Sequence, residues 1–186
     1  MGWSFSRKEV ARILTPLRTD PSVRRLTRLA LLTALALVIH LLEGQLPAPL
    51  PIPGVKLGLA NVVTLYAMFT VGPVDTFLVL LSRILLGSVF SGRATVFLYS
   101  LAGGLLCYAV TCLLRRLPRG QLWVAGIIGG MCHNVAQLAV AVLLTHTPAL
   151  AVYLPWLLLC GMGAGLFTGL CAQFLLKKLP EKLQKW

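Results

Sequence analysis

The sequence is poor in charged residues, above all in acidic ones. Of its 186 residues, 12% are charged, 58% are hydrophobic and five are acidic. Soluble domains carry about 25% charged and about 45–50% apolar residues. The composition therefore excludes an ordinary soluble domain and indicates an integral membrane protein.

Several motifs of soluble chemistry are also missing. The five cysteines lie in apolar segments and form no CxxC pair, which argues against metal ligation, a cofactor site or a disulfide framework. No Walker A motif is present, so ATP-driven transport would require partner subunits. We expect no cleavable signal peptide, because the first apolar run begins near Leu29 behind a long basic segment and lacks an A-x-A exit.

What the sequence does contain is a series of apolar runs separated by Gly, Pro and Arg. A helix needs about 20 residues to cross the hydrocarbon core, so the second and third runs are short. We predict an all-α bundle of six transmembrane helices, at 29–46, 57–71, 74–90, 94–114, 122–145 and 149–176.

The basic residues are concentrated in three blocks, which predict the topology. Fourteen of the 17 Lys and Arg residues lie in 1–28, 115–119 and 177–185. Next to apolar segments, such blocks mark the cytoplasmic side and anionic lipid rather than nucleic acid. We therefore expect a multi-pass protein of the inner (cytoplasmic) membrane with both termini cytoplasmic.

The same blocks suggest a division into a basic arm at 1–28, a membrane domain at 29–176 and a basic tail at 177–186. In the arm, Ser6-x-x-Glu9 forms a capping-box pattern before apolar residues at helical spacing. A short amphipathic helix on the cytoplasmic face and a disordered basic arm are both compatible with this pattern.

A proline-rich segment lies between the first and second runs. Prolines at 47, 49, 51 and 53 predict a stiff, extended segment, because each fixes its own φ and disfavours helix in the residue before it. Gly54 then supplies a turn before Lys56. The segment is either the wall of a pocket or a rigid loop between helices.

Polar side chains inside the apolar runs are the candidate functional residues, because ionisable groups in hydrocarbon are costly. Arg83 lies in the middle of its run, where Glu43 is the expected acidic partner and Asp75 a weaker one. The candidates for substrate binding are His40, Glu43, Lys56, Asn61, Arg83, His133, Asn134 and Gln137.

Two interpretations of this set compete. In one, the side chains converge on an outward-facing cavity that binds a polar or anionic small molecule. In the other, Glu43 and Arg83 form a structural ion pair, while the amides and imidazoles bridge helices. We favour the cavity, because so many hydrogen-bonding groups exceed what a small bundle needs for cohesion.

Five motifs in the sequence stand out together: His40-x-x-Glu43, Pro53-Gly54-Val55-Lys56-Leu57-Gly58-Leu59-Ala60-Asn61, Ser82-Arg83-Ile84-Leu85-Leu86-Gly87, Tyr99-Ser100-Leu101-Ala102-Gly103-Gly104 and His133-Asn134-x-x-Gln137. With these motifs, the sequence resembles the Gx transporter family, also labelled heptaprenyl diphosphate synthase component I, over residues 27–175. This family is similar to the substrate-binding S components of energy-coupling factor (ECF) transporters.

The resemblance implies a six-helix, S-component-like protein that captures a vitamin-like solute from the outer face. In S components, an Ala-x-x-x-Ala face of the first helix docks on a transmembrane coupling subunit that carries two ATPases. Ala30 and Ala34 fit that pattern in this sequence.

The synthase label is at odds with the residues present. Prenyl chain elongation holds Mg²⁺ on Asp-rich motifs, because this hard cation binds several carboxylate oxygens. The sequence contains two aspartates, Asp20 and Asp75, far apart. We therefore expect a non-enzymatic importer subunit. The alternatives are an accessory or scaffold subunit for isoprenoid or redox enzymes, and a stand-alone ion-coupled carrier.

Overall fold

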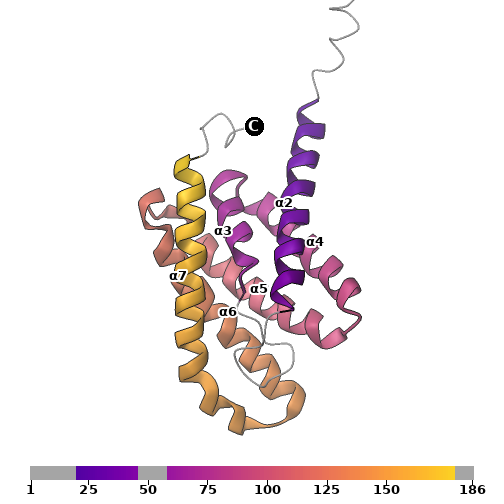
Figure 1. Cartoon of the computed structure of the whole chain (residues 1–186), viewed down its shortest axis with the longest axis vertical. Coiled ribbons are helices and arrows are strands. Elements are labelled where there is room, and N and C mark those ends of the chain that lie inside the picture. The colour runs from indigo at the N-terminus through magenta and orange to yellow at the C-terminus, as the bar shows by residue number, and fades with distance from the viewer. Residues whose placement is uncertain (1–19, 46–57, 179–186) are drawn as a thin grey trace, which may run out of the picture.

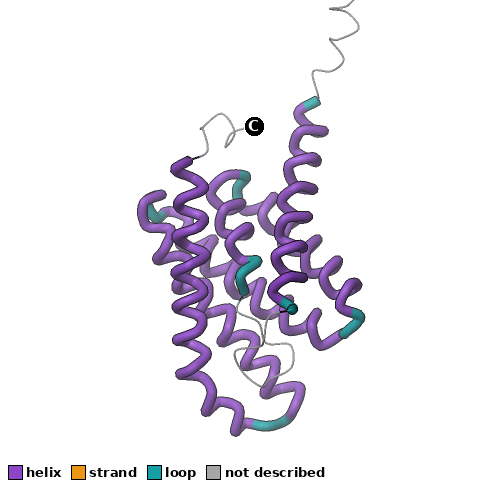
Figure 2. The backbone as a smooth tube through the Cα atoms, viewed as in Figure 1, coloured by secondary structure: helices purple, strands orange, loops and turns teal. Residues whose placement is uncertain are grey.

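The computed structural model describes residues 20–45 and 58–178, and throughout these ranges the chain forms helices without a strand (Figures 1 and 2). The all-α prediction is confirmed. The long helices are α2 (Pro21–Glu43), α3 (Asn61–Thr70), α4 (Pro73–Ser91), α5 (Ala94–Leu113), α6 (Leu122–Thr145) and α7 (Leu154–Lys178), and the short 3₁₀ turns are η2 (Leu114–Arg116), η3 (Arg119–Gln121) and η4 (Pro148–Tyr153).

Five of these helical segments are long and apolar enough to cross a bilayer: α2, α4, α5 with η2, α6, and η4 with α7. They identify a multi-pass membrane protein. Helix α3, at the position of the second predicted span, has 10 residues. At 1.5 Å per residue it extends about 15 Å, roughly half of a 30 Å hydrocarbon core, so α3 cannot cross alone.

Three of the predicted spans begin more than one residue away from the predicted position. Helix α3 begins at Asn61 rather than at Leu57. Helix α2 begins at Pro21 rather than near Leu29, because proline is compatible with the first turn of a helix. The predicted sixth helix is divided into η4 and α7. Pro155 explains the division, since proline has no N–H to donate and its ring clashes with the carbonyl four residues earlier.

Three predicted segments lie outside the described residues. They are the arm at 1–19, the proline-rich wall with Lys56 at 46–57, and residues 179–186 of the basic tail.

Helix α3 occupies the centre of the bundle and contacts each of the other five long helices. Glycines with positive φ precede and follow it, Gly58 at +81° and Gly72 at +89°. Helices α2 and α7 lie on opposite sides of α3, and the start of α2 and the end of α7 lie at the same end of the bundle (Figure 1).

Two apolar clusters fill the interior on either side of a polar layer. Along α6, Leu122 and Ala125 belong to one cluster, whereas Leu138 and Ala141 belong to the other. His133 and Asn134 lie between them, near the middle of this helix. The polar layer therefore lies between the two apolar clusters, near the middle of α6.

Glycines bring α6 and α7 to backbone contact. A Cβ added at Gly126 would lie 2.3 Å from the Gly165 carbonyl oxygen, and one added at Gly130 would lie 2.4 Å from the Gly161 carbonyl oxygen. We call this contact of α6 with Gly161, Gly165 and Gly169 the glycine seam.

We predict that Gly130→Ala destabilises the protein by roughly 1–3 kcal/mol, because the added methyl group forces the helices apart. The measurement is thermal unfolding in detergent. Gly163→Ala is the matched control, since a Cβ at Gly163 on α7 meets nothing within 4 Å. Equal melting temperatures for the two variants would contradict the role assigned to the seam.

Candidate functional site

Seven polar side chains form a buried layer across four helices. Each exposes 7% or less of its surface. The layer contains seven of the eight residues singled out from the sequence, and the eighth, Lys56, lies outside the described residues. Its members are His40 and Glu43 on α2, Asn61 on α3, Arg83 on α4, and His133, Asn134 and Gln137 on α6.

Glu43 links α2 to the start of α3. Its carboxylate accepts a hydrogen bond from the backbone N–H of Gly58. A Cβ at Gly58 would lie 2.8 Å from Asn61 Nδ2 and 3.0 Å from His133 Cδ2. Because its φ is also positive, Gly58 allows a close approach of three helices that another residue would hinder.

Further glycines make room for the polar side chains. A Cβ at Gly103 of α5 would lie 2.7 Å from His133 Nδ1, and one at Gly87 of α4 would lie 2.9 Å from His40 Cδ2. At Gly104, the Arg83 Nη2 atom would be 3.6 Å away. Gly103 and Gly104 belong to the motifs that carry the family resemblance, but neither was among the candidate site residues.

Among the described residues, Arg83 has no acidic partner in contact. No ion pair joins it to an acid in the described ranges, and its Nε and Nη2 atoms make no hydrogen bond there. The expected Glu43–Arg83 ion pair therefore does not form among the described residues, where the Glu43 carboxylate accepts a hydrogen bond from the Gly58 N–H.

Asp75, the weaker candidate partner of Arg83, pairs with Arg25 of α2 instead. Arg25 Nε lies 3.0 Å from Asp75 Oδ1 and 3.1 Å from Oδ2. Asp75 is in the first turn of α4, so the helical rise separates it from Arg83 by about 12 Å along the axis. This distance explains why the two do not meet.

Other polar atoms of the layer lack partners among the described residues: Asn61 Oδ1, His133 Nδ1 and Asn134 Oδ1. The His133 ring lies against the Gly103 backbone without ordinary hydrogen-bond geometry at Nδ1. Asn134 Nδ2 donates to the Leu157 carbonyl oxygen at 2.8 Å, which fixes the orientation of the amide.

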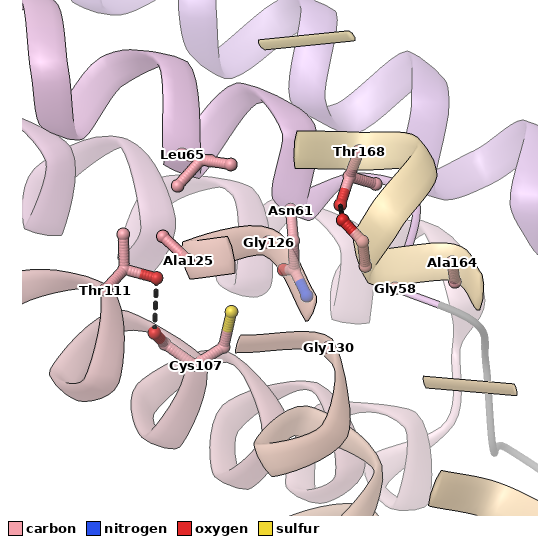
Figure 3. Close-up of a pocket in the computed structure, with 11 residues that line it drawn as sticks. Gly58, Asn61, Leu65, Cys107, Thr111, Ala125, Gly126, Gly130, Ala164 and Thr168 are labelled. Carbon is pink, nitrogen blue, oxygen red and sulfur yellow. Dashed lines mark hydrogen bonds between the residues drawn. The ribbon is translucent and has the colours of Figure 1, made fainter. Parts of the chain in front are cut away.

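A small cavity adjoins the layer between α3, α5, α6 and α7, with Asn61 pointing into it (Figure 3). Its volume of about 10 Å³ is close to what one water molecule needs. Thr111 and Thr168 border it, and their hydroxyls donate to the carbonyl oxygens of Cys107 and Gly165. The cavity is too small for a vitamin-sized solute.

Comparison with protein-family models identifies the family of the chain. The model described as heptaprenyl diphosphate synthase component I matches residues 32–175, a range that contains the whole polar layer. The chain belongs to this family. The family resemblance inferred from the sequence is therefore confirmed. No curated protein and no solved structure shows a significant match to this member of the family.

The contribution of the Asn134 amide to stability can be measured without a ligand. We predict that Asn134→Asp lowers the free energy of unfolding by about 3 kcal/mol or more, because a carboxylate cannot donate to Leu157 and its charge would be buried. Thermal unfolding measures the effect, with Gln121→Glu, the same change at an exposed position, as control. A melting temperature like that of the control would show that the bond does not stabilise the fold.

Proposed function

We propose that this protein is the solute-binding subunit of an ECF-type importer in the cytoplasmic membrane, with six spans and both termini cytoplasmic. It captures a small polar or anionic solute from the outer face and carries out no covalent chemistry. The observation that carries the proposal is the buried polar layer, in which four side chains retain unpaired polar atoms.

The unpaired atoms favour solute binding over a purely cohesive role. In a bilayer, an unsatisfied buried polar group costs several kcal/mol, so residues that merely bridge helices pair with one another. Asn134 does so in part, since its Nδ2 donates to the Leu157 carbonyl oxygen while its Oδ1 has no partner. Arg83 and His133 do not, and Arg83 is a full charge. A bound solute would supply the missing partners.

We assign the solute to the Arg83 side of the layer, between α2, α4 and α5. The cavity on the α7 side has room for about one water molecule. On the opposite side, Glu43 and His40 of α2 face the α3–α4 region through Gly58 and Gly87. In this proposal, Lys56 and the segment at 47–53 complete the site, and the helices part to admit the solute.

Helix α2 offers a surface suited to a coupling subunit. Ala30 and Ala34 are exposed and one turn apart, whereas Ala36 is buried. Small side chains on an exposed face allow another transmembrane helix to approach closely.

We predict that Ala30→Trp and Ala34→Trp abolish co-purification with a coupling subunit and its ATPases, because the indole prevents close helix contact. Ala109→Trp, at an exposed alanine of α5, is the control and should leave co-purification intact. Uptake of solute into liposomes by the protein alone, without ATP, would contradict the importer-subunit proposal.

The family description supports a second candidate, an accessory membrane subunit of a prenyl diphosphate synthase. The same co-purification experiment distinguishes the importer subunit from the accessory subunit. Recovery of a soluble prenyl synthase without ATPases, unaffected by the substitutions at Ala30 and Ala34, would favour the accessory role.

A further inference from the structure

The guanidinium of Arg83 has one complete edge without a partner. Nε and Nη2 lie side by side on this edge, and neither makes a hydrogen bond within the described ranges. Only 3% of the residue is exposed, so bulk water does not replace the missing partners. An unpaired donor pair on a buried cation is costly, and Arg83 lies near the middle of the apolar helix α4.

The neighbour of this edge on α5 is a glycine. Gly104 faces Arg83 without a side chain, and a Cβ there would be 3.6 Å from Nη2. The Glu43 carboxylate accepts a hydrogen bond from the Gly58 N–H.

We propose that Arg83 binds a carboxylate group of the solute through two parallel hydrogen bonds from Nε and Nη2. The proposal rests on the proposed function and names the chemical class of its solute. The planar fork of a guanidinium edge matches the two oxygens of a carboxylate, and such bidentate pairs are among the strongest hydrogen-bonded contacts in proteins. Lysine cannot reproduce the geometry.

Charge balance selects a carboxylate over a phosphate or diphosphate. Among the described members of the layer, Arg83 is the one permanently cationic side chain, and Glu43 already contributes a negative charge. A singly charged group adds the least uncompensated charge in a low-dielectric interior. A diphosphate would require further cations or Mg²⁺.

The test uses acetate as the probe, with acetamide as its neutral isostere and inorganic phosphate as the competing anion. The full-length protein is labelled with ¹⁵N at arginine Nε, and each probe is titrated by NMR and by thermal unfolding. We expect acetate to shift one buried Nε–H resonance and to raise the melting temperature, whereas acetamide and phosphate do neither.

Two variants then show whether the response to acetate depends on Arg83. Arg83→Lys should remove the shifted resonance and weaken acetate binding about ten-fold or more, while Arg93→Lys, at the exposed α4–α5 turn, should change neither. An equal response to acetamide, a response to phosphate alone, no response to acetate, or unchanged binding in Arg83→Lys would overturn the proposal. If Arg83→Lys does not fold, the comparison of acetate, acetamide and phosphate on the unmodified protein still tests the proposal.

Carboxylate binding and assembly with an ECF module are tested by separate measurements, acetate titration and co-purification. Loss of acetate selectivity with intact co-purification of the coupling subunits would leave an importer with another solute class. Acetate selectivity without those partners would leave a carboxylate-binding membrane protein that is not part of an ECF-type complex.

Discussion

The structure depends on one constraint, that polar groups inside a bilayer must find their partners within the protein. The polar layer meets this constraint in part. Asn134 donates to Leu157, and Glu43 accepts from Gly58. The Nε and Nη2 atoms of Arg83 have no hydrogen-bond partner among the described residues, and the proposed function rests on these two unpaired donors.

The apolar clusters and the glycines follow from the same constraint. The cluster around Leu122 and the cluster around Leu138 close the bundle on either side of the layer, which keeps its side chains nearly inaccessible to solvent. Glycines at 58, 87, 103 and 104 remove the Cβ atoms that would otherwise collide with polar side chains or, at 104, crowd two core residues. Small residues thus act here as spacers for polar chemistry as well as for helix contact.

Much of the fold could be predicted from the sequence, because hydrophobic length and Gly or Pro breaks are local signals. Helix α6 begins and ends at the predicted residues, 122 and 145, and α4 and α5 end within one residue of their predicted limits. The division at Pro155 is also a local signal, and the prediction overlooked it.

The members of the polar layer could be recognised because polar residues stand out in apolar runs. Their partners could not, because pairing depends on helix depth and rotation. Glu43 binds a backbone N–H, a donor that every residue but proline carries, so nothing in the sequence distinguishes Gly58 as its partner. Asp75 lies on the same helix as Arg83 but at a different depth, where Arg25 of α2 reaches it.

The glycine seam has a mechanical consequence. Two helices in backbone contact have no intervening side chains whose rotamer changes could accommodate sliding, so α6 and α7 behave as a single stiff strut. Helix α2 rests chiefly on α4 and α3, where larger side chains and one partly exposed ion pair make the contact. A helix movement that admitted a solute would therefore meet less resistance between α2 and α4 than between α6 and α7.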